Sequence, residues 1–219
     1  MIRAVLFDLD GTFADTAPDL GLALNLLRES YGLLPLPHET IRPVASHGAR
    51  GLLGLGFGIS PEQDDFERLR SEYLRLYEDL QHGHSALFAG MPEVLQQLGS
   101  QSRLWGIVTN KPERFTRPLM RALGLAAEAA TVVSGDTCPQ PKPHPAPMLH
   151  ACAEMGLAPD QCLYVGDAQR DVVAAHAAGM PALVAGWGYL AEDDRPQAWG
   201  ADAIIDQPQD ILIYLKSHG

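Results

Sequence analysis

The 219-residue sequence is poor in cysteine and contains no long hydrophobic run. Its three cysteines, Cys138, Cys152 and Cys162, form no Cys-x-x-Cys pair, which argues against a disulfide framework and against a structural zinc site. Such cysteine usage is typical of a reducing compartment, so we expect a cytoplasmic protein. The apolar run from Ala4 to Phe7 is too short for a signal peptide, and no stretch approaches the roughly 20 apolar residues that span a bilayer. We therefore expect no membrane partner.

Positive charge is also scarce. Lys and Arg total 16 while Asp and Glu total 27, which gives a formal net charge of −11. A nucleic-acid-binding surface is normally basic because it must neutralise phosphates, so this balance argues against a nucleic-acid partner. A small phosphorylated metabolite remains a suitable partner, because a few local cations are enough to bind it. Both a monomer and a homodimer are compatible with this composition.

Short apolar segments alternate with helical patterns along most of the chain. The apolar segments have the character of strands buried on both faces, and the helical patterns between them end at glycines. This alternation predicts crossover connections and a doubly wound parallel sheet in an α/β protein. The expected strands are residues 3–9, 104–109, 130–134, 162–165 and 182–185, and the expected helices are residues 92–98, 113–123, 145–155 and 171–178.

Residues 15–87 interrupt the alternation, because they show helical patterns only. One helix is expected to start with Thr16 as its hydroxyl cap, and another is expected to start at Ser60. An insertion of roughly 70 residues is much longer than an ordinary connection. We therefore expect a core of residues 1–14 and 88–219, and a small helical cap domain of residues 15–87 that acts as a lid.

Acidic residues follow two of the expected strands. Asp8 and Asp10 end the first strand, Asp167 ends the fourth, and Asp171 comes one helical turn later. Ligand sites in open α/β sheets form at the carboxyl ends of strands, where these residues would meet. Clustered carboxylates need a cation, and oxygen ligands suit Mg²⁺. The structural alternatives are a solvated acidic turn for Asp8 and Asp10, and a helix N-cap for Asp167.

Further along the chain, polar residues offer groups that bind phosphate. Thr109 and Asn110 end the second strand with a hydroxyl and backbone N–H groups, and Lys142 lies between two prolines ahead of a helix. Each signal is weak alone, because such residues are most often structural or solvated. In the insertion, Arg50 lies in a glycine-punctuated turn where it is expected to reach a substrate anion, although a surface role is equally common for such an arginine.

Taken in order, these motifs resemble those of the haloacid dehalogenase-type phosphatases. Residues 8–12 (Asp-Leu-Asp-Gly-Thr) resemble the first motif, Thr109 the second, Lys142 the third, and residues 166–171 the fourth. The resemblance covers essentially the whole chain. It implies a Rossmann-like core with a small helical cap, and Mg²⁺-dependent hydrolysis of a phosphomonoester.

The resemblance also implies a role for each motif residue. Asp8 would attack phosphorus and carry the phosphoryl group, while Asp10 would act first as general acid and then as general base. Mg²⁺ would be held by the carboxylates of Asp8 and Asp167 and by the backbone carbonyl of Asp10. The phosphate-binding residues would be Thr109, Asn110 and Lys142, supported by Asp171.

Two segments of the sequence also reduce the number of candidate substrates. The overall pattern resembles phosphoglycolate phosphatases, whereas residues 46–50 and 188–202 look closer to bacterial enzymes that act on N-acetylmuramic acid 6-phosphate. Both compounds combine a phosphomonoester with a carboxylate, so Arg50 suits either. The small residues around Arg50 (Gly48, Ala49 and Gly51) favour the bulkier sugar. We therefore place the amino-sugar phosphate first and phosphoglycolate second.

Other activities use similar residues. A receiver-like signalling module also accepts a phosphoryl group at strand ends around Mg²⁺, a phosphomutase would retain phosphate on Asp8 for longer, and a dehalogenase would not need the metal. Asp10 adds an acid catalyst beside the nucleophile, and a cap-sized insertion sequesters the site. Both features favour a phosphatase.

Overall fold

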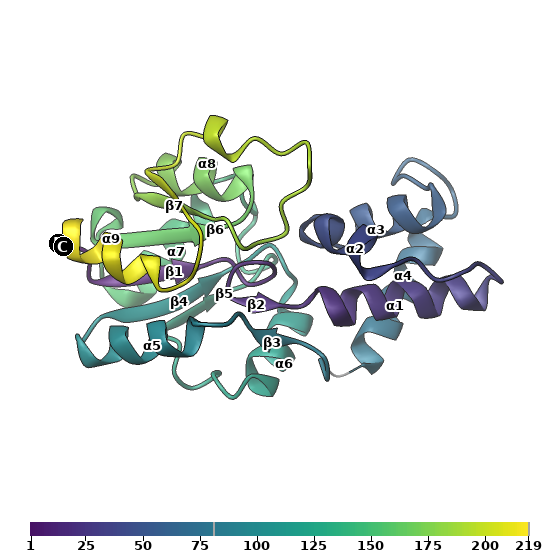
Figure 1. Cartoon of the computed structure of the whole chain (residues 1–219), viewed down its shortest axis with the longest axis horizontal. Coiled ribbons are helices and arrows are strands. Elements are labelled where there is room, and N and C mark those ends of the chain that lie inside the picture. The colour runs from purple at the N-terminus through teal and green to yellow at the C-terminus, as the bar shows by residue number, and fades with distance from the viewer. Residues whose placement is uncertain (81, 219) are drawn as a thin grey trace.

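The computed structural model describes residues 1–80 and 82–218, and it shows a sheet-containing core beside a helical part (Figure 1). The core is built on a six-stranded sheet with the order β5-β4-β1-β6-β7-β8, and all its pairings are parallel. The expected parallel α/β fold is therefore confirmed. The strands are β1 (Ala4–Phe7), β4 (Leu104–Val108), β5 (Thr131–Val133), β6 (Cys162–Gly166), β7 (Ala182–Ala185) and β8 (Ala203–Ile205).

The register of the central strands decides which residues meet at the carboxyl edge. Phe7, the last residue of β1, pairs with Ile107 of β4 and with Val165 of β6. The residues that follow these positions therefore emerge side by side at one edge of the sheet. This edge is where the acidic motifs come together.

Helices cover both faces of the sheet. Val5 and Phe7 of β1 face one side, where α5 (Met91–Ser100), α6 (Glu113–Ala122) and α9 (Asp210–His218) pack. Ala4 and Leu6 face the other side, where α7 (Ala146–Met155) and α8 (Gln169–Ala177) pack. All four β1 residues are fully buried, which is why the strand reads as a continuous apolar run.

The helical part consists of α1 (Ala17–Ser30), α2 (His38–Ile41), the 3₁₀ segment η1 (Arg42–His47), α3 (Gly48–Phe57) and α4 (Phe66–Asp79). Apolar faces of α1, α3 and α4 form a cluster of their own. Phe115 from α6 and Tyr189 from the loop after β7 join this cluster, so the helical part packs on the core.

Short strands at the ends of the insertion correct the expectation of helices alone. β2 (Ala14–Asp15) pairs antiparallel with β3 (Ala86–Leu87), at the point where the chain enters and leaves the helical part. A strand of two residues is too short to produce an alternating pattern, so the sequence gives no signal for it.

The first helix of the insertion begins where it was expected, but its hydroxyl cap was wrong, and the second helix begins later than expected. Thr16 occupies the N-cap position of α1, but its hydroxyl makes no cap hydrogen bond and donates instead to Asp10 Oδ1 at 2.6 Å. The helix expected from Ser60 begins at Phe66, because residues 61–65 form turns. The observed helix buries Phe66, Leu69 and Tyr73.

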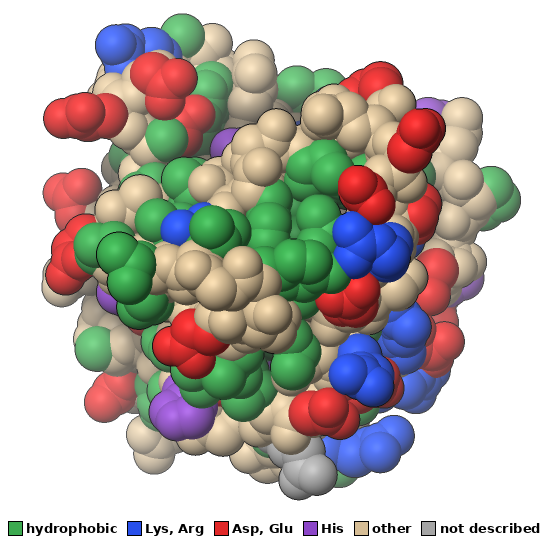
Figure 2. Space-filling view, turned by 90° about the vertical axis from the view of Figure 1, so that its right-hand side faces the viewer, with side chains coloured by type: hydrophobic (Ala, Val, Ile, Leu, Met, Phe, Trp, Pro, Cys, Tyr) green, Lys and Arg blue, Asp and Glu red, His purple; other side chains and the backbone are tan. Residues whose placement is uncertain are grey.

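The surface of the helical end mixes charges of both signs. Figure 2 shows acidic and basic side chains interspersed around hydrophobic ones on this face. Across the described residues, none of the helices has the length and apolar character needed to cross a membrane.

Candidate active site

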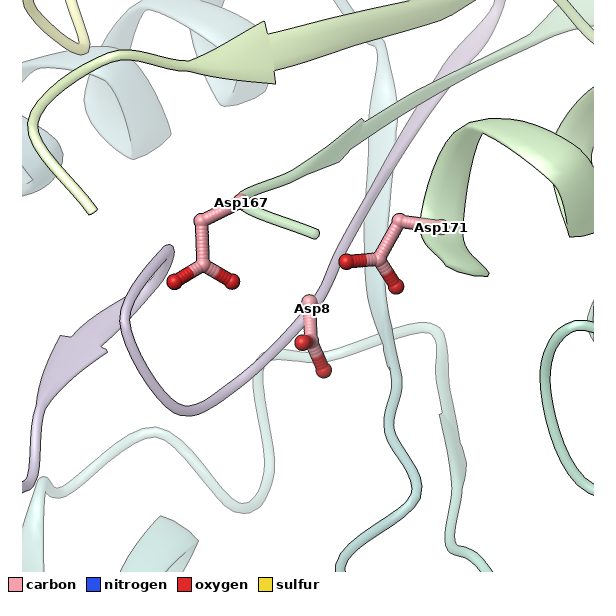
Figure 3. Close-up of side chains that lie close together, drawn as sticks. All are labelled: Asp8, Asp167 and Asp171. Carbon is pink, nitrogen blue, oxygen red and sulfur yellow. The ribbon is translucent and has the colours of Figure 1, made fainter. Parts of the chain in front are cut away.

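Three buried carboxylates meet at the carboxyl edge of the sheet (Figure 3). Asp8 follows β1, Asp167 follows β6, and Asp171 lies in the first turn of α8. One oxygen of each lies within 4.8 Å of an oxygen of the others. The side-by-side strand ends produce this cluster, because β1 and β6 pair directly.

Lys142 neutralises part of this cluster. Its Nζ lies 2.9 Å from Asp8 Oδ1 and 2.7 Å from Asp171 Oδ1. It also donates to the carbonyl of Val108 at 2.9 Å and to the Tyr164 hydroxyl at 2.8 Å. An ammonium group has three N–H donors, so these four acceptors use all of them. Lys142 therefore fixes the position of Asp8 and Asp171.

The three carboxyls differ in acidity. Burial by itself raises the pKa of Asp8, but the charges of Lys142 and Arg170 outweigh it and lower that pKa below its ordinary value. Burial raises the pKa of Asp171 despite the opposing charge of Lys142. Burial, together with the charges of Asp8 and Asp171, raises the pKa of Asp167 to about 7. Asp8 is thus held ionised, and Asp167 is the carboxyl that most needs a cation.

The donor set fits a hard divalent cation. All three side chains offer oxygen, and Asp167 is held in place by hydrogen bonds to Oδ2 from Tyr189 N at 2.8 Å and Ser46 Oγ at 2.9 Å. Gly11 and Gly188 lie against this carboxylate, where any side chain would collide with it. The described chain therefore contains a buried group of three carboxylates that suits a divalent cation.

Asp10 lies beside a second lysine that the sequence analysis missed. Lys111 Nζ is 2.9 Å from Asp10 Oδ1, and the same oxygen accepts the Thr16 hydroxyl. The ammonium also lies 4.7 Å from the ring centroid of Tyr77, and its side chain is 6% exposed. Burial alone would lower the pKa of Lys111, but the charge of Asp10 outweighs it and raises that pKa. The position of Lys111, directly after Thr109 and Asn110, is the one sequence signal that pointed to it.

Thr109 and Asn110 lie at the end of β4, as expected, but they differ in availability. Thr109 is buried, and its hydroxyl accepts a hydrogen bond from Lys111 N at 3.1 Å. The amide of Asn110 donates to the carbonyl of Lys142 and accepts from its N–H, each at 2.9 Å. The Asn110 side chain therefore holds the loop of Lys142 in place.

A cavity of about 760 Å³ connects the acidic cluster with the helical part. It is lined by Asp8, Asp10 and Thr109 from the core and by residues of η1, α3 and α4 from the insertion. Arg50 lines it and is exposed, as expected for a residue that meets a ligand rather than the core. This volume lies in the upper part of the range of about 300–1,000 Å³ typical of small-molecule sites.

The two glycines near Arg50 differ in the space that a side chain would find. A side chain at Gly48 would meet open space, which agrees with the expected room for a ligand. A side chain at Gly51 would collide with the Cβ of His47. Gly51 also lines the cavity, and its lack of a side chain is needed for the packing of α3 against η1.

Tyr189 links the acidic cluster to the base of the helical part. Its backbone N–H binds Asp167, while its hydroxyl accepts hydrogen bonds from the N–H groups of Thr16 at 2.6 Å and Ala17 at 2.8 Å. The same hydroxyl donates to Asp15 Oδ1 at 2.8 Å. The start of α1 is therefore anchored to a residue that also orients a member of the carboxylate cluster.

Two further contacts from η1 hold the helical part against the core. Arg42 pairs with Asp15 at 2.7 Å, and its guanidinium lies 4.8 Å from the ring centroid of Tyr189. Ser46 binds Asp167 through its hydroxyl, and its carbonyl accepts a hydrogen bond from Arg170 at 3.0 Å. Ser46 and Arg170 were not predicted as site residues, because both contacts join segments more than 100 residues apart.

This fold and this arrangement of acids at strand ends define a class of hydrolase. The chain belongs to the haloacid dehalogenase-like hydrolase family, whose model matches residues 5–185.

Named relatives are similar over nearly the whole chain. The chain is 38% identical to the N-acetylmuramic acid 6-phosphate phosphatase of Pseudomonas aeruginosa, a match that covers 98% of this chain and 95% of the relative. It is 43% identical to the phosphoglycolate phosphatase of Xanthomonas campestris pv. campestris, with 95% and 94% covered. A crystal structure of a predicted phosphoglycolate phosphatase from Haemophilus somnus superimposes with a TM-score of 0.85, at 29% identity and 98% coverage of both chains.

Proposed function

We propose that the chain is a magnesium-dependent phosphatase that hydrolyses a small phosphomonoester through a phosphoryl group carried on Asp8. One observation supports this most directly: Asp8 is buried, lines the cavity, and is held ionised beside Lys142. A carboxylate that is fixed and kept ionised is suited to nucleophilic attack. The names of the relatives, which are phosphatases, support the same reaction class.

The reaction proceeds in two displacements at phosphorus. An oxygen of Asp8 bonds to phosphorus while the ester P–O bond breaks, and the leaving alkoxide takes a proton from Asp10. Water then attacks phosphorus, Asp10 takes up a proton from that water, and the bond between phosphorus and Asp8 breaks. Inorganic phosphate leaves, and both aspartates return to their starting states.

The other site residues support these steps. Asp8 and Asp167, with the backbone carbonyl of Asp10, would hold Mg²⁺, which offsets the repulsion between the phosphate and the carboxylate nucleophile. Asp171 positions Lys142 through the 2.7 Å ion pair. The Thr109 hydroxyl, at the end of β4, binds an oxygen of the phosphoryl group.

Residues 15–87 act as a cap domain in this proposal. They supply one wall of the cavity, and the contacts of Arg42 with the Tyr189 ring and of Ser46 with Asp167 hold that wall against the core. A covered site keeps bulk water away from the phosphorylated Asp8 until the alcohol product has left the cavity. We place the enzyme in the cytoplasm on the basis of its cysteine usage.

For the substrate, we place N-acetylmuramic acid 6-phosphate ahead of 2-phosphoglycolate. The cavity of about 760 Å³ is much larger than the two-carbon acid needs, whereas it accommodates a substituted sugar. We expect kcat/KM for the amino-sugar phosphate to exceed that for phosphoglycolate on one enzyme preparation. The measurement is phosphate release from both compounds and from p-nitrophenyl phosphate.

Comparing the three substrates distinguishes the possible functions. A tenfold or greater preference for phosphoglycolate, about 1.4 kcal/mol in transition-state binding, would reverse the order of the two substrates without affecting the reaction class. A single stoichiometric phosphorylation of Asp8 without turnover of any compound would instead indicate a receiver-like phospho-acceptor. A net transfer of phosphate to a second position of the sugar would indicate a phosphomutase.

Arg50 is expected to bind the part of the substrate that does not react. Because this exposed arginine lines the cap wall of the cavity, Arg50→Ala should lower kcat/KM for the natural substrate far more than for p-nitrophenyl phosphate. The ratio of the two losses is the quantity to measure. Equal losses on both compounds, or no loss, would assign Arg50 a structural role.

A further inference from the structure

Arg170 is a positively charged residue next to the three carboxylates, and it has no role in the reaction described above. It lies in the first turn of α8, between Asp167 and Asp171, and it lines the cavity together with Asp8 and Asp10. Its side chain is half-buried, and one of its N–H groups donates to the carbonyl of Ser46 at 3.0 Å.

Lys142 and Lys111, the two lysines of the site, already bind protein groups. All three N–H donors of Lys142 are used by protein acceptors, and Lys111 pairs with Asp10. Over residues 1–80 and 82–218, the guanidinium of Arg170 forms no ion pair with a carboxylate. A guanidinium has five N–H donors, so Arg170 keeps donors for a ligand.

Arg170 and Asp8 line the same cavity. The charge of Arg170 is one of the charges that lower the pKa of Asp8. Burial by itself lowers the pKa of Arg170, but the charges of Asp171, Asp8 and Asp167 outweigh it and raise that pKa. Arg170 therefore places a positive charge on the wall of the cavity that also contains Asp8.

We propose that Arg170 binds the non-bridging oxygens of the transferring phosphoryl group, with its guanidinium oriented by the hydrogen bond to the Ser46 carbonyl of the helical part. The proposal rests on the proposed phosphatase function. A planar guanidinium fork matches phosphate oxygens with two parallel N–H donors, which a lysine ammonium cannot do. Arg170 thereby supplies a guanidinium donor beside Lys142, whose ammonium pairs with Asp8 and Asp171.

The test uses Arg170→Met and Arg170→Lys. Because every phosphomonoester has the same phosphoryl group, Arg170→Met should lower kcat/KM by about 10²–10³ on p-nitrophenyl phosphate and on the natural substrate alike. Affinity for orthovanadate, which mimics the group in transfer and has no leaving group, should fall with it. Arg170→Lys keeps the charge without the fork, so it should fall between wild type and Arg170→Met in both measurements.

Arg70→Met is the matched control, because it removes another arginine that lines the cavity, from α4. It should leave vanadate affinity within about threefold of wild type, a difference of less than 1 kcal/mol. Thermal melting and circular dichroism establish whether each variant is folded. If Arg170→Met does not fold, the vanadate affinity of Arg170→Lys tests the proposal. Unchanged vanadate and orthophosphate affinity in folded Arg170 variants would overturn the proposal and leave Arg170 as a cap contact. Failure of the phosphatase function would appear separately, as a wild-type protein that turns over no phosphomonoester.

Discussion

Asp8→Asn is expected to abolish phosphate release while the protein remains folded. An amide is not a nucleophile toward phosphorus, so no phosphoryl group can be transferred to the protein. The substituted side chain still offers an oxygen to Lys142 Nζ and to the N–H of Leu9, which bind Asp8 Oδ1 at 2.9 and 2.8 Å. Lys142 also keeps its pair with Asp171, so no buried charge is left alone. Turnover of p-nitrophenyl phosphate and a thermal melt measure the two halves of this expectation.

Asp10→Asn is the comparison for that variant, because it removes proton transfer and leaves the nucleophile in place. Its rate on an alkyl phosphate should fall by about 10²–10⁴. The loss on p-nitrophenyl phosphate should be smaller, because nitrophenolate leaves without a proton. Near-normal turnover by Asp8→Asn, in a preparation free of other phosphatases, would refute attack by Asp8.

Removal of divalent metal is expected to abolish activity completely. Without a cation, the buried carboxylates of Asp8, Asp167 and Asp171 repel an incoming phosphate. EDTA should therefore stop turnover, and Mg²⁺ should restore it. Ca²⁺ should inhibit, because its larger and looser coordination misplaces the nucleophile. Full activity after rigorous chelation would remove the magnesium assignment.

The affinity for Mg²⁺ should depend on pH in a defined direction. The pKa of Asp167 is raised to about 7 in the absence of a cation, so below pH 7 this carboxyl holds a proton that must leave before metal binds. The apparent affinity should weaken as the pH falls from 8 to 6. Titrating activity with Mg²⁺ at the two pH values, with Arg50→Ala as a variant that leaves the acids intact, measures the effect.

The sheet was predictable because its signals are local. The central strand β1 is buried on both faces, so its four residues are all apolar and the run stops where Asp8 begins. β7 was predicted with its observed bounds for the same reason. The edge strand β8 has three residues with different degrees of burial, and it was missed because it shows neither a continuous apolar run nor a regular alternation.

Long-range partners account for most of what the sequence did not reveal at the site. Lys111 and Asp10 are 101 positions apart, and Ser46 and Asp167 are 121 positions apart. No periodicity or spacing connects such residues, since only the folded chain decides which loops face each other. Thr16 shows that nearby partners can also be unpredictable. Its hydroxyl could either cap α1 or bind Asp10, and the sequence does not distinguish the two.

The antiparallel pair formed by β2 and β3 has a consequence for how this chain can change. The path into the helical part and the path out of it are hydrogen-bonded neighbours, so the insertion begins and ends at one point on the core. Closing a loop between adjacent ends costs little more when the loop becomes longer or shorter, by about 0.6 kcal/mol for each doubling of length. Helical modules of quite different size can therefore be transplanted onto this ribbon without moving the strands that align Asp8 and Asp167. In the proposed phosphatase, substrate selectivity would therefore vary with the insertion while the nucleophile and its strand stay unchanged.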